Sequence, residues 1–226
     1  MNTVGKLSRI SQMTIYSVAP ENYRSAMAKQ DVIVVHGGSC WASYTEYLNE
    51  LKKTKFKPGA SPSNNWQQSL QVGLGPRFRI LLPEMPNWQN AKYQEWKIWF
   101  ANICEASDDS PLVVGHSLGS IFLVRYYSES KTLKGIKKLF LVSTPYATMS
   151  ENPDFGDFAF KRAPTNLRKQ AERITFYHSK DDRIVPFENI DKYKSIFPDA
   201  HYHIFEHQGH FIQKSFPELV RDLKAT

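Results

Sequence analysis

Cysteine and long apolar runs are scarce in this chain of 226 residues. Its two cysteines, Cys40 and Cys104, are too few for a disulfide framework, so we expect a protein of the reducing cytoplasm. No apolar run approaches the roughly 20 residues that cross a bilayer. The first six residues also lack the continuous apolar stretch of a secretory signal. We therefore expect neither a membrane span nor a disulfide-rich secreted domain.

A long basic tail is also missing, although the formal net charge is +7. The lysines and arginines occur in short groups, and no glycine-aromatic RNA-binding motif accompanies them. We interpret these groups as solvated loops and helix faces, and we expect no nucleic-acid partner. What the chain does contain is 41% hydrophobic and 13% aromatic residues, enough for a sizeable core. We expect one domain over residues 1–226, with residues 1–30 forming an extension or an edge strand at 13–18.

Short apolar runs rich in β-branched residues recur along the chain, with helix-like or loop segments between them. Runs of this length are typical of central parallel strands that are covered on both faces. The alternation predicts an α/β fold with a doubly wound, mostly parallel sheet of about six strands and helices on both faces. The six predicted strands are Asp31–Val35, Phe78–Leu82, Leu112–Val114, Ile136–Val142, Arg173–Tyr177 and Tyr202–Phe205.

Aromatic residues between 93 and 103 repeat at helical spacing, which predicts one buried stripe rather than a ligand platform. Residues 143–170 break the alternation, with three prolines and the phenylalanines Phe155, Phe158 and Phe160. This stretch is long for a plain connection. It is either a short lid whose phenylalanines wall a partly open site, or an ordinary loop whose aromatics fill the core.

Gly115-His116-Ser117-Leu118-Gly119 follows the apolar run that ends at Val114. A serine between glycines at this spacing, after a strand and before a helix, predicts a nucleophile elbow. The turn leaves no room for a Cβ at either glycine, and it lifts the Ser117 hydroxyl above the sheet. We therefore assign Ser117 as a nucleophile.

A serine hydroxyl needs a base within hydrogen-bond reach, and that base needs an acid to orient it. Both follow later strands in the expected order, Asp182 after the fifth and His210 after the sixth. Asp181 is the alternative acid, but we favour Asp182 and interpret Asp181 as a turn residue. The other histidines near the sixth strand lack a recognised zinc spacing, so we expect no metal.

An oxyanion hole would complete this chemistry with two backbone N–H donors. One is expected at Leu118, after the nucleophile. The other is expected in the loop after the first central strand, at Gly38 or at Ser39, with His36 bracing that loop. We interpret Cys40 as a packing residue rather than a reactive thiol. Residues assigned to substrate binding are Ser39, His116, Phe155 and Phe158.

These motifs together resemble the retinoblastoma-binding protein 9/YdeN family of serine hydrolases, which are small α/β-hydrolases with little or no cap. The likeness covers roughly residues 31–220. The resemblance implies a triad of Ser117, Asp182 and His210, with esterase-like activity on small acyl substrates. The loop after Gly37 departs from the family's usual form, so the second oxyanion donor stays open. The motifs are V-V-H-G-G at 34–38, P-E-M-P at 83–86, Trp96, G-H-S-L-G at 115–119, S-K-D-D-R-I-V-P-F at 179–187 and G-H-F at 209–211.

The resulting hypothesis is a serine hydrolase that cleaves small carboxylic esters through an acyl-enzyme, without a cofactor. A serine peptidase or amidase on short peptides is one alternative. A non-catalytic module that binds a protein partner on the same fold is the other, because fold alone does not prove activity.

Overall fold

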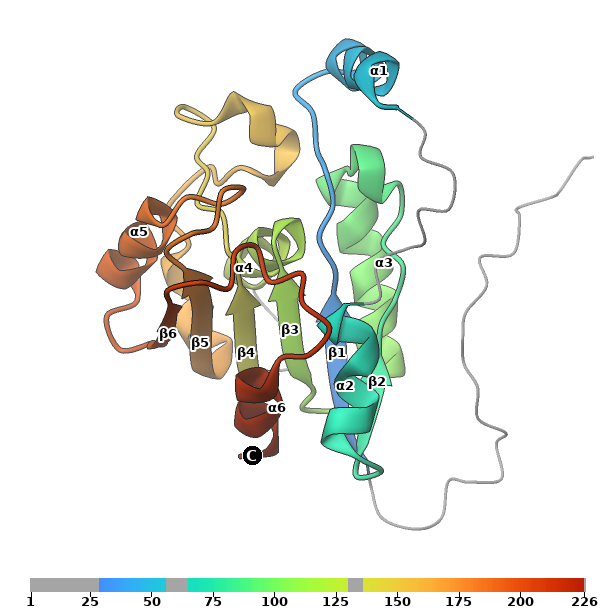
Figure 1. Ribbon diagram of the computed structural model, residues 1–226, viewed down its shortest axis with the longest axis vertical. Coiled ribbons are helices and arrows are strands. Elements are labelled where there is room, and N and C mark those ends of the chain that lie inside the picture. Colours follow the sequence, from blue (N-terminus) through green and yellow to red (C-terminus); the bar gives the residue numbers. More distant parts are fainter. Residues whose placement is uncertain (1–28, 56–64, 130–135, 226) are drawn as a thin grey trace, which may run out of the picture.

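The computed structural model describes residues 29–55, 65–129 and 136–225. Within them, six parallel strands form one sheet in the order β2-β1-β3-β4-β5-β6 (Figure 1). All six predicted strands are confirmed, with ends that shift by no more than two residues. The suggested strand at 13–18 lies outside the described residues. The strands are β1 Gln30–Val35, β2 Phe78–Leu81, β3 Leu112–His116, β4 Ile136–Val142, β5 Ala171–Ser179 and β6 His201–Phe205.

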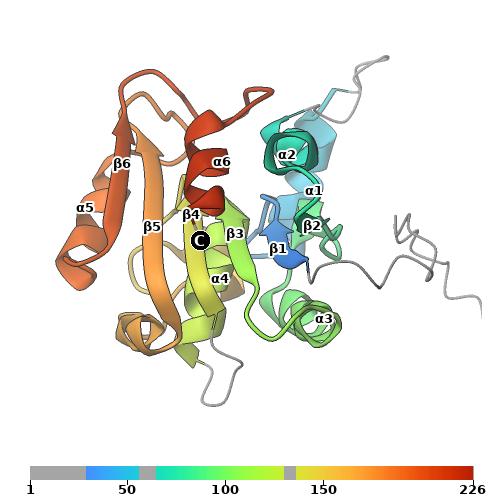
Figure 2. The same cartoon turned by 90° about the horizontal axis from the view of Figure 1, so that it is seen from below.

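Helices cover both faces of the sheet, as Figure 2 shows. One face carries α2 (Trp66–Leu74) and α6 (Pro217–Lys224). The opposite face carries α3 (Tyr93–Ala106), α4 (Leu118–Glu129) and α5 (Glu188–Ile196). The remaining helix, α1 (Tyr44–Lys53), lies beyond the carboxyl ends of the strands (Figure 1). No helix in the described ranges is long and apolar enough to span a membrane.

The strand order reverses between β1 and β3, so that α2, which precedes β2, and α4, which follows β3, lie on opposite faces of the sheet. In open α/β sheets, ligand sites lie in the crevice at such a switch point, at the carboxyl ends of the strands. The central strands β1, β3 and β4 are mostly buried, and β3 and the last four residues of β4 show no exposed side chain. The rigid interior therefore fixes where each following loop begins.

The aromatic stripe on α3 is part of the core, as the sequence predicts. Tyr93, Trp96 and Phe100 are buried against Phe122 of α4, where Trp96 and Phe100 pack edge-on and Tyr93 is tilted. Edge-to-face contacts of this kind add about 0.5–1.5 kcal/mol each beyond the area they bury. The interpretation of the stripe as core rather than ligand platform is confirmed.

Residues 143–170 contain two short 3-10 helices, η3 (Pro153–Phe158) and η4 (Thr165–Lys169). Phe158 has no exposed surface and packs against Trp96, and Phe160 is 3% exposed. The Arg125 guanidinium donates to the carbonyls of Asp157 and Ala159, which fastens this stretch to α4. The expectation that Phe158 and Phe160 wall the substrate site is therefore wrong. Both rings fill the core, because α3 and α4 leave an aromatic-lined gap there.

Candidate active site

Ser117 lies in a sharp turn between β3 and α4 with a positive φ of 53°. Left-handed backbone costs a non-glycine residue roughly 1–2 kcal/mol, and such strain concentrates at functional sites. A Cβ on Gly119 would lie 2.4 Å from the Val35 carbonyl oxygen, and one on Gly115 would lie 2.7 Å from Ser120 Cα. Both positions therefore require glycine, as the elbow interpretation predicts.

The loop after β1 lies directly against the nucleophile. A Cβ on Gly37 would stand 3.2 Å from the Ser117 Cβ and 3.7 Å from its Oγ. His36 braces this loop in the way the sequence predicts. Its Nε2 accepts the Met85 N–H at 2.9 Å, so its Nδ1 carries the proton and donates to the Gly37 carbonyl at 2.5 Å. Burial is the main cause that lowers the pKa of His36 and keeps this ring neutral.

Two backbone amides next to Ser117 are available as oxyanion donors. Within the described ranges, the N–H groups of Leu118 and Gly38 donate to no protein acceptor. A Cβ on Gly38 would lie 3.4 Å from Leu118 Cδ2, so the two residues adjoin. The Ser39 N–H instead donates to the Trp88 carbonyl at 2.8 Å. The Ser39 amide is therefore not free to act as the second oxyanion donor, and the Gly38 amide is the remaining candidate.

The acid loop after β5 and the histidine loop after β6 bring Asp182 and His210 together. His210 Nδ1 lies 2.9 Å from Asp182 Oδ2 and 3.1 Å from Oδ1. The carboxylate has no exposed side-chain surface, and the imidazole is 12% exposed. Asp181 instead accepts the Ser179 hydroxyl and the Gly209 N–H, so it ties the two loops together. Asp182 is thus the carboxylate paired with histidine, and Asp181 stabilises the turn.

Four donors hold the Asp182 carboxylate. Besides His210, they are the Ser143 hydroxyl at 2.6 Å and the amides of Ile184 and Val185 at 2.9 Å each. Burial alone would raise the pKa of Asp182, but the hydrogen bonds outweigh it and bring the pKa to about 2. The carboxylate is therefore ionised at neutral pH, as a group that stabilises an imidazolium must be.

Ser143 is a site residue that the sequence analysis does not single out. It follows β4 directly, is fully buried, and has a φ of 46°. Its position at the carboxyl end of a central strand is the signal that could have found it, since functional side chains gather at this edge.

The loops that carry Ser117 and His210 contact each other through His116, the residue before Ser117. The Nε2 of His116 donates to the His210 carbonyl at 2.9 Å, and the two imidazole rings lie 5.0 Å apart. Within the described residues no hydrogen bond joins Ser117 Oγ to His210. Catalytic hydrogen bonds are commonly long before a substrate binds. The loops that carry the nucleophile and the base are thus in contact, with their reactive atoms not yet bonded.

The residues assigned to substrate binding fall into different environments. His116 is buried, and burial is the main cause that lowers its pKa to about 4, so it is a neutral internal donor. Ser39 holds the 88–91 turn through its backbone, and Phe155 is half-buried beside Cys40. Phe158, in the core, cannot contact a substrate. Burial raises the pKa of Cys40 to about 12, which agrees with a packing role rather than a reactive thiol.

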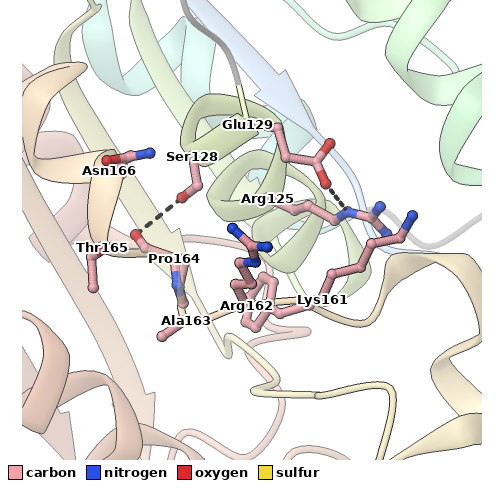
Figure 3. A pocket seen from close by; sticks show the side chains of 10 residues that line it. Arg125, Ser128, Glu129, Lys161, Arg162, Ala163, Pro164, Thr165 and Asn166 are labelled. Carbon is pink, nitrogen blue, oxygen red and sulfur yellow. Dashed lines mark hydrogen bonds and ion pairs between the residues drawn. The ribbon is translucent and has the colours of Figure 1, made fainter.

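One hollow lies away from these residues. It measures about 690 Å³ and lies between α4 and the 160–166 segment. Figure 3 shows Arg125 paired with Glu129 on one side, with Lys161 and Arg162 on the other. Phe160 lines this hollow, but Ser117, Asp182 and His210 do not, which places it outside the candidate active site.

The histidines on and after β6 do not converge. His203 Nε2 lies 2.9 Å from Asp222 Oδ2 on α6, whereas His210 pairs with Asp182. The described part of the chain contains no group of three or more histidine, cysteine, aspartate or glutamate side chains arranged to hold a metal ion.

A parallel sheet with a strained serine between β3 and α4, and an aspartate–histidine pair after β5 and β6, defines an α/β-hydrolase. The family model described as serine hydrolase matches residues 58–218, more than half of the chain. The chain therefore belongs to the serine hydrolase family, in its RBBP9/YdeN-like branch.

Two curated relatives are similar to this chain in sequence, and one solved structure is similar to it in fold. Serine hydrolase RBBP9 of Rattus norvegicus is 25% identical over 171 residues, which are 74% of this chain and 89% of the relative. YdeN of Bacillus subtilis is 26% identical over 162 residues, 68% and 82% of the two chains. The crystal structure of the B. subtilis ydeN gene product matches with a TM-score of 0.64 at 20% identity, covering 87% of this chain and 98% of that chain. The predicted fold class is confirmed.

Proposed function

We propose that this protein hydrolyses small carboxylic esters through an acyl-enzyme, with Ser117 as nucleophile, His210 as general base and acid, and Asp182 as its partner. The pairing of a buried, ionised Asp182 with His210 Nδ1 carries this proposal. With Nδ1 protonated toward the carboxylate, Nε2 is free to take the serine proton.

The reaction proceeds in two balanced halves. Ser117 Oγ attacks the ester carbonyl carbon while His210 Nε2 takes the hydroxyl proton. The carbonyl oxygen becomes an oxyanion, which the N–H groups of Leu118 and Gly38 stabilise. Removal of one such donor typically costs about 3–4 kcal/mol of activation energy. When the oxyanion collapses, the C–O bond to the alcohol breaks and His210 returns the proton to the leaving oxygen.

Deacylation repeats this chemistry with water. His210 takes a proton from the water, whose oxygen attacks the acyl carbonyl. The bond to Ser117 Oγ then breaks, and the serine regains its proton. The products are an alcohol and a carboxylic acid, and no cofactor enters the balance. Positive charge forms on His210 in both halves, next to the Asp182 carboxylate that stabilises it.

The test is hydrolysis of p-nitrophenyl acetate by the full chain and by Ser117→Ala. We expect the alanine variant to lose about 10⁶-fold in kcat, as other serine hydrolases do when the nucleophile is removed. Ser128→Ala is the matched control, because Ser128 lies on α4, the helix that follows Ser117, and within the described residues its hydroxyl bonds the carbonyls of Val124 and Pro164. The control should retain the parent rate and the parent labelling by a fluorophosphonate probe.

Two further measurements distinguish the esterase from the alternatives, a serine peptidase and a non-catalytic binding module. Faster turnover of aminoacyl p-nitroanilides than of matched p-nitrophenyl esters would favour a peptidase. A parent protein that neither hydrolyses esters nor reacts with the fluorophosphonate would favour a non-catalytic module and would overturn the esterase proposal.

A further inference from the structure

Trp66, the first residue of α2, is tied to the chain that follows His210. Its indole N–H donates to the Phe211 carbonyl at 2.8 Å, and its backbone N–H donates to the Gln213 carbonyl at 2.8 Å. The ring has no exposed surface and packs edge-on against Phe216. One residue of α2 therefore holds the segment after His210 through both its side chain and its backbone.

A second buried donor holds the neighbouring carbonyl. His116 Nε2 donates to the His210 carbonyl at 2.9 Å. The His116 ring also lies edge-on to Trp66, with ring centroids 5.9 Å apart. The carbonyls of two successive residues, 210 and 211, are thus each bound by a side chain, and these two side chains contact each other.

The backbone around His210 needs such support. Gly209 and Phe211 both have left-handed conformations, with φ values of 52° and 53°. This conformation is unfavourable for phenylalanine and persists only where the surroundings hold it. The Phe211 ring is buried against Phe205 and Phe216, and its carbonyl takes the Trp66 bond. Without that bond, the strained turn next to His210 loses the donor that holds the Phe211 carbonyl.

We propose that Trp66 and His116 are positioning residues, which fix the 210–211 backbone so that the His210 imidazole stays between Asp182 and Ser117. This inference rests on the proposed esterase function. Neither side chain is placed to touch a substrate, since both are buried beneath the loop. Their effect should therefore fall on kcat rather than on KM, because a base displaced by about 1 Å can lose up to 100-fold in rate.

Trp66→Phe tests the indole bond, and Tyr193→Phe is its control. Both changes remove one buried donor to a backbone carbonyl at 2.8 Å and keep an aromatic ring. Tyr193, however, belongs to the other core cluster, and its hydroxyl donates to the Pro145 carbonyl. With p-nitrophenyl acetate we expect kcat to fall about 10- to 100-fold in Trp66→Phe, with KM within about twofold. Tyr193→Phe should keep the parent kcat.

His116 supplies an independent test if Trp66→Phe fails to fold. His116→Gln keeps an N–H donor for the His210 carbonyl, whereas His116→Leu removes it. We expect the glutamine variant to retain at least about one third of the parent kcat and the leucine variant to fall about 10-fold or more. Equal losses in the two variants would contradict a role for the donated hydrogen bond.

Proton NMR distinguishes failure of the positioning proposal for Trp66 and His116 from failure of the esterase proposal. The low-field proton between His210 Nδ1 and Asp182 should be sharp in the parent and in Tyr193→Phe, and broadened or absent in Trp66→Phe and His116→Leu. This signal does not depend on turnover. An unchanged signal and a kcat equal to the control would overturn the positioning role, whereas an inactive parent with these signal changes would overturn the esterase proposal alone.

Discussion

Ser143 offers a quantitative test of how the acid is held. Its hydroxyl donates to the buried Asp182 carboxylate at 2.6 Å, so Ser143→Ala removes one of four donors to a charged group. A hydrogen bond to a charge contributes about 1.5–3 kcal/mol. Because three donors remain, we take about 2 kcal/mol as the loss in unfolding free energy. For a protein of this size that corresponds to a Tm lower by about 4–8 °C.

Ser143→Gly separates the hydrogen bond from backbone strain. The glycine variant loses the same bond, but it relieves the left-handed φ of 46° that alanine must still adopt. That relief is about 1 kcal/mol, so the glycine variant should melt about 2–4 °C above the alanine variant. The order of Tm values should therefore be parent, Ser143→Gly, Ser143→Ala.

Calorimetry at pH 7 measures the three Tm values, and p-nitrophenyl acetate turnover accompanies it. We expect kcat to fall less than about 10-fold in both variants, since Asp182 keeps its bond to His210 and stays ionised. An alanine variant that melts within about 1 °C of the parent would refute the assigned strength of the bond. A glycine variant less stable than the alanine variant would refute the assigned strain.

Two further predictions concern stability. Gly119→Ala places a Cβ 2.4 Å from a backbone oxygen and should lower the unfolding free energy by about 3 kcal/mol or more, measured in urea. Its control, Gly75→Ala, meets no atom within 4 Å and carries only the cost of a φ of 81°, about 1–2 kcal/mol, so a loss as large as that of Gly119→Ala would contradict the steric argument. Acid should also destabilise the fold, because burial first, and then the charge of His210, lowers the pKa of His116 from 6.5 to about 4. The unfolded chain takes up this proton first, so about 3 kcal/mol should be lost as the pH falls from about 6.5 to about 4. Asp182, with a pKa lowered from 3.8 to about 2, should remove about 2 kcal/mol more between about pH 4 and pH 2. Urea titrations across this range should show both steps, and a His116→Gln variant that keeps the upper step would contradict its assignment.

Features of the site that depend on local chemistry could be predicted from the sequence. The apolar runs predict the strands because central strands need apolar side chains on both faces. The elbow is predictable because neighbouring backbone excludes a Cβ at Gly115 and Gly119. The positions of Asp182 and His210 follow from the order of the strands, since the carboxyl ends of parallel strands meet at one edge.

Features that depend on contacts between distant segments could not be predicted. Phe158 looks the same in the sequence whether it walls a site or fills the gap beside Trp96. The choice between Gly38 and Ser39 depends on the Trp88 carbonyl, which engages the Ser39 amide. Ser143 donates to Asp182, which lies 39 residues later in the chain, and Trp66 donates to the Phe211 carbonyl, 145 residues later.

Short patterns of residues therefore encode the strands, the elbow and the identity of the paired acid and histidine. Which side chains hold that pair in place, and which aromatics lie in the core, follows from contacts that form only in the folded protein. Those outcomes depend on how buried donors find acceptors and how rings fill gaps between elements far apart in the chain, and no local pattern records such pairings.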